Sequence, residues 1–321
     1  MRAAVGVDLG GTKIAAGIVD ADGIVHARGS VPTPAAHGPG AILDAVVALV
    51  GELLEGLARS ASVDAPSFEI VGCGVGSAGV IDVERGRVAS STDTLTGWAG
   101  TPVRDVLQAG LGMPVAVVND VHAHALGEAV HGSGRDARTV LMIAAGTGVG
   151  GALVVDGRVH TGRHGASGHF GHIPSPEAAG RACTCGGAGH LEAVASGPAM
   201  CAVYRKLSGD GSVDDGREVV RRAESGDPHA GASVDLAGAA IGRAIGALMN
   251  ALDPDAVIVG GGLAGAGERW WHALRSGAER ERLTLLADTP IVAGSLGTDA
   301  AIVGAAVLAM SQAPDLVEGT A

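Results

Sequence analysis

The chain of 321 residues has a net charge of −12, and aromatic residues make up only 2% of it. An acidic chain with few aromatic side chains excludes the usual classes of nucleic-acid-binding protein, which attract phosphates with basic residues or stack bases on aromatic rings. The length allows two domains, each with its own hydrophobic core.

Cysteine usage and hydropathy indicate where the protein acts. Four cysteines are spread over the chain, and the opening MRAAVGVDLG lacks the pattern of a signal peptide. The longest uncharged stretch near membrane length, residues 139–155, is interrupted at its centre by the glycines of GTGVGG. We therefore expect a cytoplasmic protein with no membrane span and no nucleic-acid partner.

The chain begins with three short apolar runs separated by turns. The runs cover residues 3–7, 14–19 and 24–28, and the first turn, residues 8–13, reads DLGGTK. The same order of strand, glycine turn, strand, Asp-Gly turn and strand returns at residues 139–161, with GTGVGG as its glycine turn. This repetition predicts a duplicated domain whose two glycine turns offer backbone N–H groups to a polyphosphate.

A helix and a strand are predicted between the two copies. Apolar residues three and four positions apart predict a helix over residues 42–58, and residues 70–75 are typical of a strand. Residues 74–79 then match GxGxxG, but the following VIDVERGRV predicts a hairpin with a turn at Arg85-Gly86. Since a dinucleotide-binding fingerprint requires a helix there, we expect no dinucleotide site.

A carboxylate stands at the end of the next predicted strand. Residues 115–118 are apolar, Asn119 and Asp120 follow, and residues 121–130 are predicted to be helical. A carboxylate between a strand end and a helix N-terminus is held rigidly and stays ionised. The alternative is that Asn119 or Asp120 only caps the helix.

The loop of residues 168–192, GHFGHIPSPEAAGRACTCGGAGHLE, concentrates metal-binding side chains. His172, Cys183, Cys185 and His190 offer the imidazole and thiolate ligands that Zn²⁺ prefers, in a loop with little apolar surface to order it. The alternative is a solvated glycine-rich loop with incidental thiols. A metal here would also fix Glu192, two residues after His190.

The remainder of the chain is mostly helical. Helices are expected over residues 191–207, 217–225, 229–252 and 299–310. Strands are expected at residues 256–259, before a third glycine turn, and at 290–293. Alternating strands and helices indicate an α/β protein.

Several of these segments together resemble one family. DLGGTK, NDVHAHALGE at residue 119, GTGVGG, GHI at residue 171, CTCGGAGHLE at residue 183 and IVGGG at residue 258 occur in the order typical of the ROK family of repressors and sugar kinases. The resemblance covers nearly the whole chain, and among family members the chain is most similar to actinobacterial glucokinases.

The resemblance implies a duplicated actin/hexokinase-like, or ribonuclease H-like, α/β fold with a cleft between two domains. We expect a small domain from residues 1–118 and 300–321, and a large domain from residues 119–299 that carries the zinc-binding loop. The implied activity is ATP-dependent phosphorylation of the 6-hydroxyl of a hexose, with glucose as the family default. ATP, Mg²⁺ and structural Zn²⁺ are the implied cofactors, and a homodimer or homotetramer is the expected assembly.

The resemblance also assigns roles to individual residues. Asp120 is expected to be the general base, and Asn119 and Glu192 are expected to bind sugar hydroxyls. His172 is expected to bind both zinc and the anomeric hydroxyl. The full expected sugar-binding set is Asn119, Asp120, His169, His172, Glu192 and Gly79. The expected ATP- and phosphate-binding set is Asp8, which orients Mg²⁺ through water, with Gly10, Gly11, Thr12, Lys13, Gly146, Thr147, Gly148, Gly261 and Gly262.

Three positions depart from the family pattern. His169 replaces the Glu of Glu-x-Gly-His, which usually binds the hydroxyl at carbon 3. His190 replaces the fourth cysteine ligand, giving a Cys₂His₂ set that zinc also accepts. The segment before Trp98 offers Thr92 and Thr94 where an Asn is usual. We interpret His169 as an altered sugar contact, against the alternatives of neutral drift and of competition with His172 for the metal.

Three functions compete on this evidence. A sugar kinase for glucose or for an amino-, acetamido- or cyclitol-like hexose agrees with every motif. A ROK repressor would need a helix-turn-helix domain, and only seven residues precede Asp8. A non-catalytic sugar-binding regulator would be expected to lose Asp120 or the glycine turns, and all are present.

Overall fold

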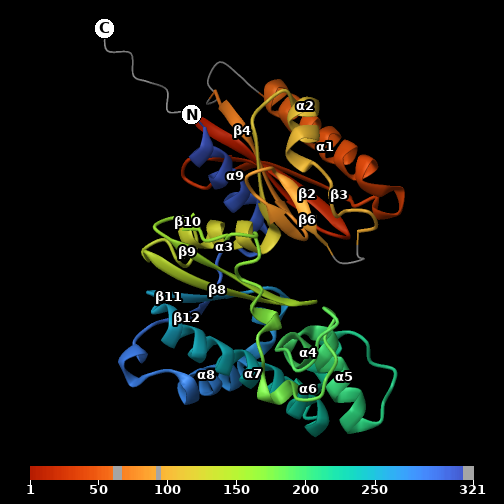
Figure 1. The fold of residues 1–321 in the computed structure, drawn as a ribbon, viewed down its shortest axis with the longest axis vertical. Helices are drawn as coiled ribbons and strands as arrows, with labels where there is room; N and C mark the ends of the chain where they lie inside the picture. The colour runs from red at the N-terminus through yellow and green to blue at the C-terminus, as the bar shows by residue number, and fades with distance from the viewer. Residues whose placement is uncertain (61–66, 92–94, 314–321) are drawn as a thin grey trace. The chain divides into compact units, whose positions relative to one another are not determined.

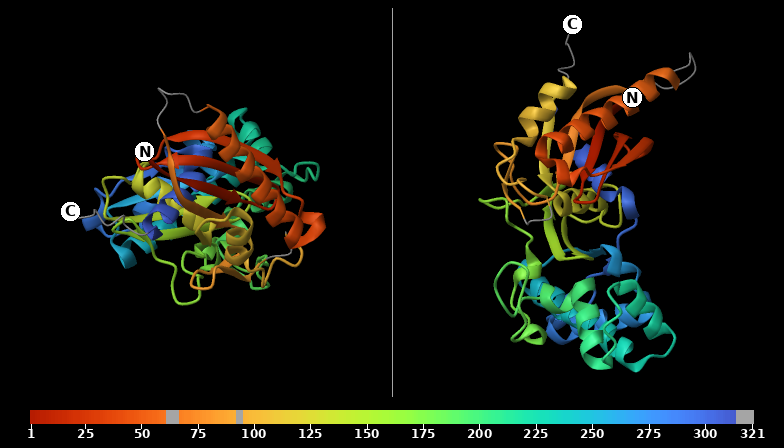
Figure 2. Two further views of the ribbon diagram at one scale, coloured as in Figure 1. Left: turned by 90° about the horizontal axis from the view of Figure 1, so that it is seen from above. Right: turned by 90° about the vertical axis from the view of Figure 1, so that its right-hand side faces the viewer.

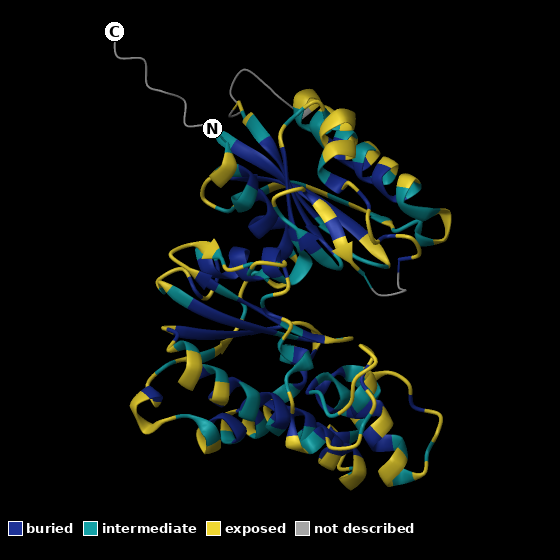
Figure 3. Cartoon of the chain, viewed as in Figure 1, coloured by how far each residue is buried: buried dark blue, intermediate teal, exposed yellow. Residues whose placement is uncertain are grey.

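The computed structural model describes residues 1–60, 67–91 and 95–313 and divides into two compact units (Figure 1). The first comprises Met1–Arg135, Gly157–Ser167 and Ser295–Ala321, and the second comprises Asp136–Asp156 and Gly168–Gly294. Strands of both units are largely buried, whereas exposed residues gather on the helices and loops (Figure 3).

The first unit is built on a five-stranded sheet of order β3-β2-β1-β4-β7. β1 pairs antiparallel with β2 and parallel with β4, and β4 pairs parallel with β7. A separate antiparallel hairpin, β5–β6, follows β4, so the hairpin predicted after the GxGxxG match is confirmed. The strands are β1 (Arg2–Leu9), β2 (Lys13–Asp20), β3 (Val25–Pro32), β4 (Glu69–Ser77), β5 (Val80–Asp82), β6 (Arg87–Ser90) and β7 (Val115–Asn119).

Helices lie against this sheet (Figures 1 and 2). α1 (Gly38–Ser60) buries Ile42 and Val46 in one apolar core with residues of α2 (Val103–Leu111). α2 was not predicted from the sequence. α9 (Ala300–Gln312) buries Ile302 in a separate core with residues of β1 and β2. α3 (Asp120–Val130) in turn packs against α9.

The other five-stranded sheet has the order β10-β9-β8-β11-β12, and all of its strands except β10 belong to the second unit. Its pairing repeats that of the first sheet, because β8 pairs antiparallel with β9 and parallel with β11, which pairs parallel with β12. This repeated topology confirms the duplication. The strands are β8 (Thr139–Ala145), β9 (Val149–Val155), β10 (Arg158–Val159), β11 (Ala256–Gly260) and β12 (Ile291–Ala293).

The helices of the second unit share one core with β8 and β11. The expected single helix over residues 191–207 is wrong, because Ser196 is extended and divides it into α4 and α5. The Ser196 side chain caps α5, and Pro198 in its first turn has no N–H to continue a preceding helix. The helices are α4 (Glu192–Ala195), α5 (Gly197–Ser208), α6 (Gly216–Glu224), α7 (Pro228–Leu252) and α8 (Gly267–Glu281), of which α8 was not predicted.

α7 is long and apolar enough to cross a membrane by length and composition. However, 56% of its most apolar window is buried inside the protein, and it packs closely against α8. The core helix of a globular domain passes the same test, so this helix alone is weak evidence for a span.

The fully buried carboxylate of Glu128 joins separate segments of the first unit. Its Oε2 accepts hydrogen bonds from the N–H groups of Ser133 (3.1 Å) and Ser295 (3.0 Å), and its Oε1 accepts one from Leu296 (2.8 Å). These bonds and the packing on α9 group α3 with the first unit. The expected domain division after residue 118 assigned α3 to the other unit and therefore differs from the contacts.

The α3–α9 contact yields a stability prediction. A Cβ at Gly304 would lie 1.8 Å from the carbonyl oxygen of Ala123, whereas a Cβ at Gly51 in α1 would meet nothing within 4 Å. Gly304→Ala should lower the free energy of unfolding by about 1–3 kcal/mol or more. Gly51→Ala, the same change in an open helical position, should be neutral or stabilise by up to about 1 kcal/mol. Urea unfolding of both variants measures the difference, and equal stabilities would contradict the close contact.

Candidate functional site

Asn119 and Asp120 stand where β7 ends and α3 begins. Asn119 is extended and caps α3, since its Oδ1 accepts from the N–H groups of Val121 (3.0 Å) and His122 (3.3 Å). Its Nδ2 donates to the carbonyl oxygen of Gly79 (2.9 Å). The sequence left open whether this pair only caps the helix or holds a carboxylate in place. The structure allows both, because Asn119 caps α3 and thereby fixes Asp120, which follows it.

Asp120 and Asp8 are two carboxylates of raised pKa, and the charge of Asp120 acts on Asp8. Burial raises the pKa of Asp120 above its ordinary value, although the Val121 N–H, 2.9 Å from Oδ1, opposes the rise. Burial also raises the pKa of Asp8 to about 6, helped by repulsion from Asp120 and opposed by Lys13. A carboxylate of raised pKa is a stronger base, and two repelling carboxylates suit a hard divalent cation.

The first glycine turn lies between β1 and β2. Gly10 N–H donates to the Lys13 carbonyl (3.1 Å), and Thr33 anchors the turn from both sides: its Oγ1 donates to Gly10 O (2.8 Å) and its N–H to Thr12 O (3.0 Å). Thr12 and Lys13 are exposed. Thr33 was missed in the sequence because it is remote from the glycine motif, and only the strand pairing places it there.

In the second unit, His172, Cys183, Cys185 and His190 converge. Their ligand atoms all lie within 4.8 Å of one another, with Cys183 Sγ 3.6 Å from His172 Nδ1 and Cys185 Sγ 3.2 Å from His190 Nδ1. Tetrahedral zinc with ordinary bond lengths requires sulfur–nitrogen separations of about 3.6 Å. Burial raises the pKa of the Cys183 thiol, and a bound cation would favour the thiolate. The four residues therefore fit zinc in number, donor type and spacing.

His169 lies outside this cluster. It is exposed, its ring centroid is 6.1 Å from that of His172, and the metal-ligand group of the described residues does not include it. His172 presents Nδ1 to the cluster, which leaves Nε2 on the opposite side of its ring. The geometry thus favours His172 over His169 as the metal ligand.

Glu192 links the loop that carries Cys183 and Cys185, called the cysteine loop below, to the second glycine turn. Its Oε1 accepts from the hydroxyl of Thr184, between the two cysteines, at 2.5 Å, and its Oε2 accepts from the N–H of Val149 at 2.9 Å. A carboxylate oxygen has a further lone pair, so these bonds leave capacity for ligand hydroxyls. Thr184 was not identified in the sequence, where it is an ordinary residue between two ligands.

The second glycine turn forms part of a pocket of about 480 Å³. This volume falls in the range of small-molecule sites. Gly146 accepts a hydrogen bond from Gly197 N–H (2.8 Å), which attaches the turn to the start of α5. The pocket is lined by Gly146, Thr147, Gly197, Pro198, Asp214, Asp215, Gly216, Arg217, Gly262 and Leu263.

The pocket only partly matches the expected phosphate-binding set. Gly146, Thr147 and Gly262 line it. Gly148 instead lies against Glu192 Oε2, 2.7 Å from where its Cβ would be, and Gly261 adopts a φ of +81° with a Cβ position 2.3 Å from Ala145 O. The sequence did not identify the residues of α5 and α6 that line this pocket, although Ser196-Gly197-Pro198 and Asp214-Asp215-Gly216 are typical of helix starts. Thr92 and Thr94 lie outside the described residues.

Comparison with known proteins places this geometry in a family. The model of the ROK family matches residues 4–312. The chain is 34% identical to a glucokinase of Streptomyces coelicolor, over 98% of this chain and 99% of that one, and 33% identical to an N-acetylmannosamine kinase of Salmonella typhimurium, over 94% and 97%.

A solved structure supports the same assignment. A ROK family glucokinase from Streptomyces griseus, in complex with glucose and AMPPNP, matches with a TM-score of 0.78 and 32% identity over 96% of this chain and 99% of that one. The expected actin-like fold is thereby confirmed. This chain belongs to the ROK family.

Proposed function

We propose that the protein is an ATP-dependent kinase that transfers a phosphoryl group to the 6-hydroxyl of a hexose, with glucose as the first candidate. The observation that carries this proposal is the Asn119–Asp120 pair, which a strand end and a helix cap hold in place. Support comes from the glucokinases among its relatives and from the solved complex of one of them with glucose and AMPPNP.

Asp120 would act as the general base. As the 6-hydroxyl oxygen attacks the terminal phosphorus, its proton passes to the Asp120 carboxylate, and the bond to the departing nucleoside diphosphate breaks. Burial raises the pKa of Asp120, which increases its affinity for that proton. The remaining work is alignment and charge neutralisation, as in phosphoryl transfer generally.

The donor would be bound by the glycine turns and by the pocket beside the second of them. Backbone N–H groups of such turns suit phosphate oxygens, while the carboxylates of Asp214 and Asp215 suit the hydroxyl donors of a ribose. Mg²⁺, when bound, would neutralise phosphate charge. Asp8 would hold it through water, which relieves the repulsion between Asp8 and Asp120.

The cysteine loop would position the sugar. Zinc at His172, Cys183, Cys185 and His190 would supply order to the loop, with no part in the chemistry. His172 Nε2 and the Glu192 carboxylate would then bind sugar hydroxyls, because Thr184 ties Glu192 to the same loop.

A modified hexose is the second candidate substrate. His169 occupies the position where the family pattern has Glu, and one of the chain's relatives is an N-acetylmannosamine kinase. An assay of ATP-dependent phosphorylation across hexoses, aminohexoses and acetamidohexoses would distinguish the two candidates.

The base assignment predicts the effect of Asp120→Asn. Turnover should fall by about 10² to 10⁴, because the amide keeps the shape but cannot accept the proton. Sugar affinity, measured by calorimetry, should change little. Asp44→Asn, the same substitution at an exposed position of α1, serves as the control and should keep full activity. Near-normal kcat in Asp120→Asn would refute the assignment.

Metal content provides a second test. The purified protein should contain about one zinc per chain. Cys185→Ser should lose it and weaken sugar binding, and Cys201→Ser, which changes a buried thiol outside the cluster, should retain it. Elemental analysis of protein purified without chelator measures both, and a metal-free wild type would contradict the site.

His169→Glu tests the sugar contact. An ionised carboxylate accepts two hydroxyl bonds where neutral imidazole accepts one, so the exchange is worth about 1–3 kcal/mol of binding. We expect kcat/KM to rise for glucose and to fall for the native substrate if that is a modified hexose. His164→Glu, in another exposed loop position, controls for the charge change. Identical responses of all sugars would exclude a contact with His169.

A further inference from the structure

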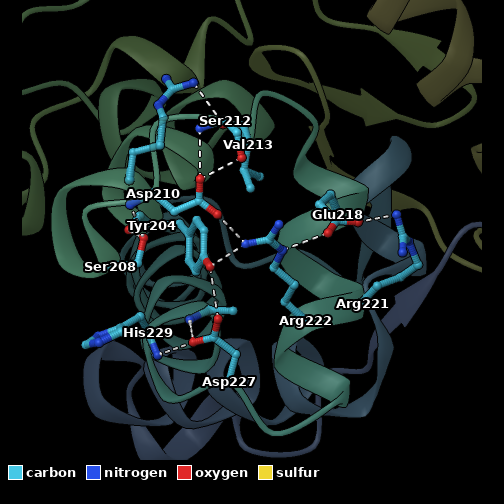
Figure 4. A network of polar contacts seen from close by, with 12 residues as sticks. Tyr204, Ser208, Asp210, Ser212, Val213, Glu218, Arg221, Arg222, Asp227 and His229 are labelled. Carbon is cyan, nitrogen blue, oxygen red and sulfur yellow. Dashed lines mark hydrogen bonds and ion pairs between the residues drawn. The ribbon is translucent and has the colours of Figure 1, made fainter.

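A polar network in the second unit centres on Arg222 of α6 (Figure 4). Its Nη1 donates to Asp210 Oδ2 (2.7 Å) and to Tyr204 Oη (2.7 Å), and its Nε donates to Glu218 Oε1 (2.7 Å). The guanidinium also lies over the Tyr204 ring, 5.4 Å from its centroid. One side chain thus joins the end of α5, the loop after it and α6.

Tyr204 extends this network to a third helix. Its ring is buried, and its hydroxyl donates to Asp227 Oδ2 (3.0 Å), the residue that caps α7. Because the hydroxyl accepts from Arg222 and donates to Asp227, its hydrogen-bonding capacity is satisfied in one orientation. Two hydrogen bonds and burial of the ring therefore hold Tyr204, the residue of α5 that Arg222 contacts, in place.

The loop between α5 and α6, residues 209–215, is fixed at two points before it reaches the pocket. Asp210, besides accepting from Arg222, accepts from Ser212 N–H (2.9 Å) and from the Ser212 hydroxyl (2.6 Å). The carbonyl of buried Val213 accepts from Arg205 Nη1 (2.9 Å). The next two residues are the carboxylates that line the pocket.

The same helices supply the pocket walls. Gly197 and Pro198 begin α5, and Gly216 and Arg217 begin α6, and all four line the pocket. Arg222 lies one to two turns along α6 from Gly216 and Arg217. Tyr204 lies about two turns along α5 from Gly197 and Pro198. The network therefore fixes the spacing of two helix ends and the loop between them.

We propose that Arg222 is a positioning residue for the phosphoryl donor, which sets the nucleoside pocket by holding Asp210 and Tyr204 together. This inference rests on the proposed function, in which that pocket receives the nucleoside. Arg222 touches neither substrate, so its removal should weaken nucleotide binding and leave the sugar site intact.

The test compares Arg222→Met with Arg221→Met. Arg221 is the neighbour on α6 and pairs with Glu218, but its ion pair includes neither Asp210 nor Tyr204. Arg222→Met should raise the KM for ATP and the Kd for AMPPNP on the order of tenfold, the usual size of an effect that reaches a site through neighbouring residues. The KM for sugar and the kcat at saturating ATP should stay at wild-type values, as should all constants of Arg221→Met. Arg222→Lys, which keeps the charge but not the fork, should restore part of the affinity.

Equal nucleotide affinities in the two variants would overturn the proposal, as would a parallel loss of sugar affinity in Arg222→Met. If Arg222→Met does not fold, Asp210→Asn provides the test instead. This variant weakens only the contact between Arg222 and the loop, at a partly exposed position. It should raise the KM for ATP alone, and an unchanged KM would overturn the proposal.

A pocket-filling variant separates this inference from the proposed function. Gly262 lines the pocket, and a Cβ there meets nothing within 4 Å, so Gly262→Val should fold and obstruct the nucleoside. If Gly262→Val leaves the KM for ATP unchanged, the nucleoside assignment of the pocket fails. If Gly262→Val raises it and Arg222→Met does not, only the role of Arg222 fails.

Discussion

Direct backbone contact between α9 and its neighbours is the constraint on which the first unit depends. Cβ atoms at Gly6 and Gly74 would lie 1.9 and 1.7 Å from the carbonyl oxygens of Ile302 and Ala305. Only glycine, which has no Cβ, lets α9 lie this close to β1 and β4. α3 packs on α9 through a similar contact, between Gly304 and the carbonyl oxygen of Ala123. Since α3 begins at Asp120, the position of the proposed base depends on glycines remote from it in sequence.

Glu192 has a comparable role in the second unit. Through Thr184 and Val149, it joins the metal-ligand loop to the strand that follows the second glycine turn. The proposed sugar-positioning loop and the proposed phosphate-binding turn thus share one carboxylate. If the proposed zinc is lost, disorder in the loop would reach the turn through these two hydrogen bonds, so the proposed metal would affect the phosphate-binding turn without taking part in the chemistry.

The sequence predicted the parts of the fold that depend on local patterns. The repeated meander is found as two sheets of the same topology, and the four zinc-ligand candidates converge. The remainder depends on contacts between distant segments. The helix is broken at Ser196 because Ser196 caps α5 and Pro198 follows it, although the apolar pattern continues across the break. α3 joins the first unit through the hydrogen bonds of Glu128 and the close contact at Gly304. Arg222 was not singled out, since its partners come from three different elements.

Burial of Asp8, together with repulsion from Asp120, reduces the stability of the fold at neutral pH. The ordinary pKa of Asp8 is 3.8, and in the folded protein it is about 6, so the folded state holds this proton more tightly than the unfolded state does. Stability therefore falls as the pH rises from about 4 through about 6, and above that range the cost is complete, at about 3 kcal/mol. A cation between phosphate and Asp8 would offset this cost only when the donor is bound. Burial of Asp8 is the main cause of this cost and repulsion from Asp120 adds to it, so the proposed metal-nucleotide complex would be favoured over the empty site.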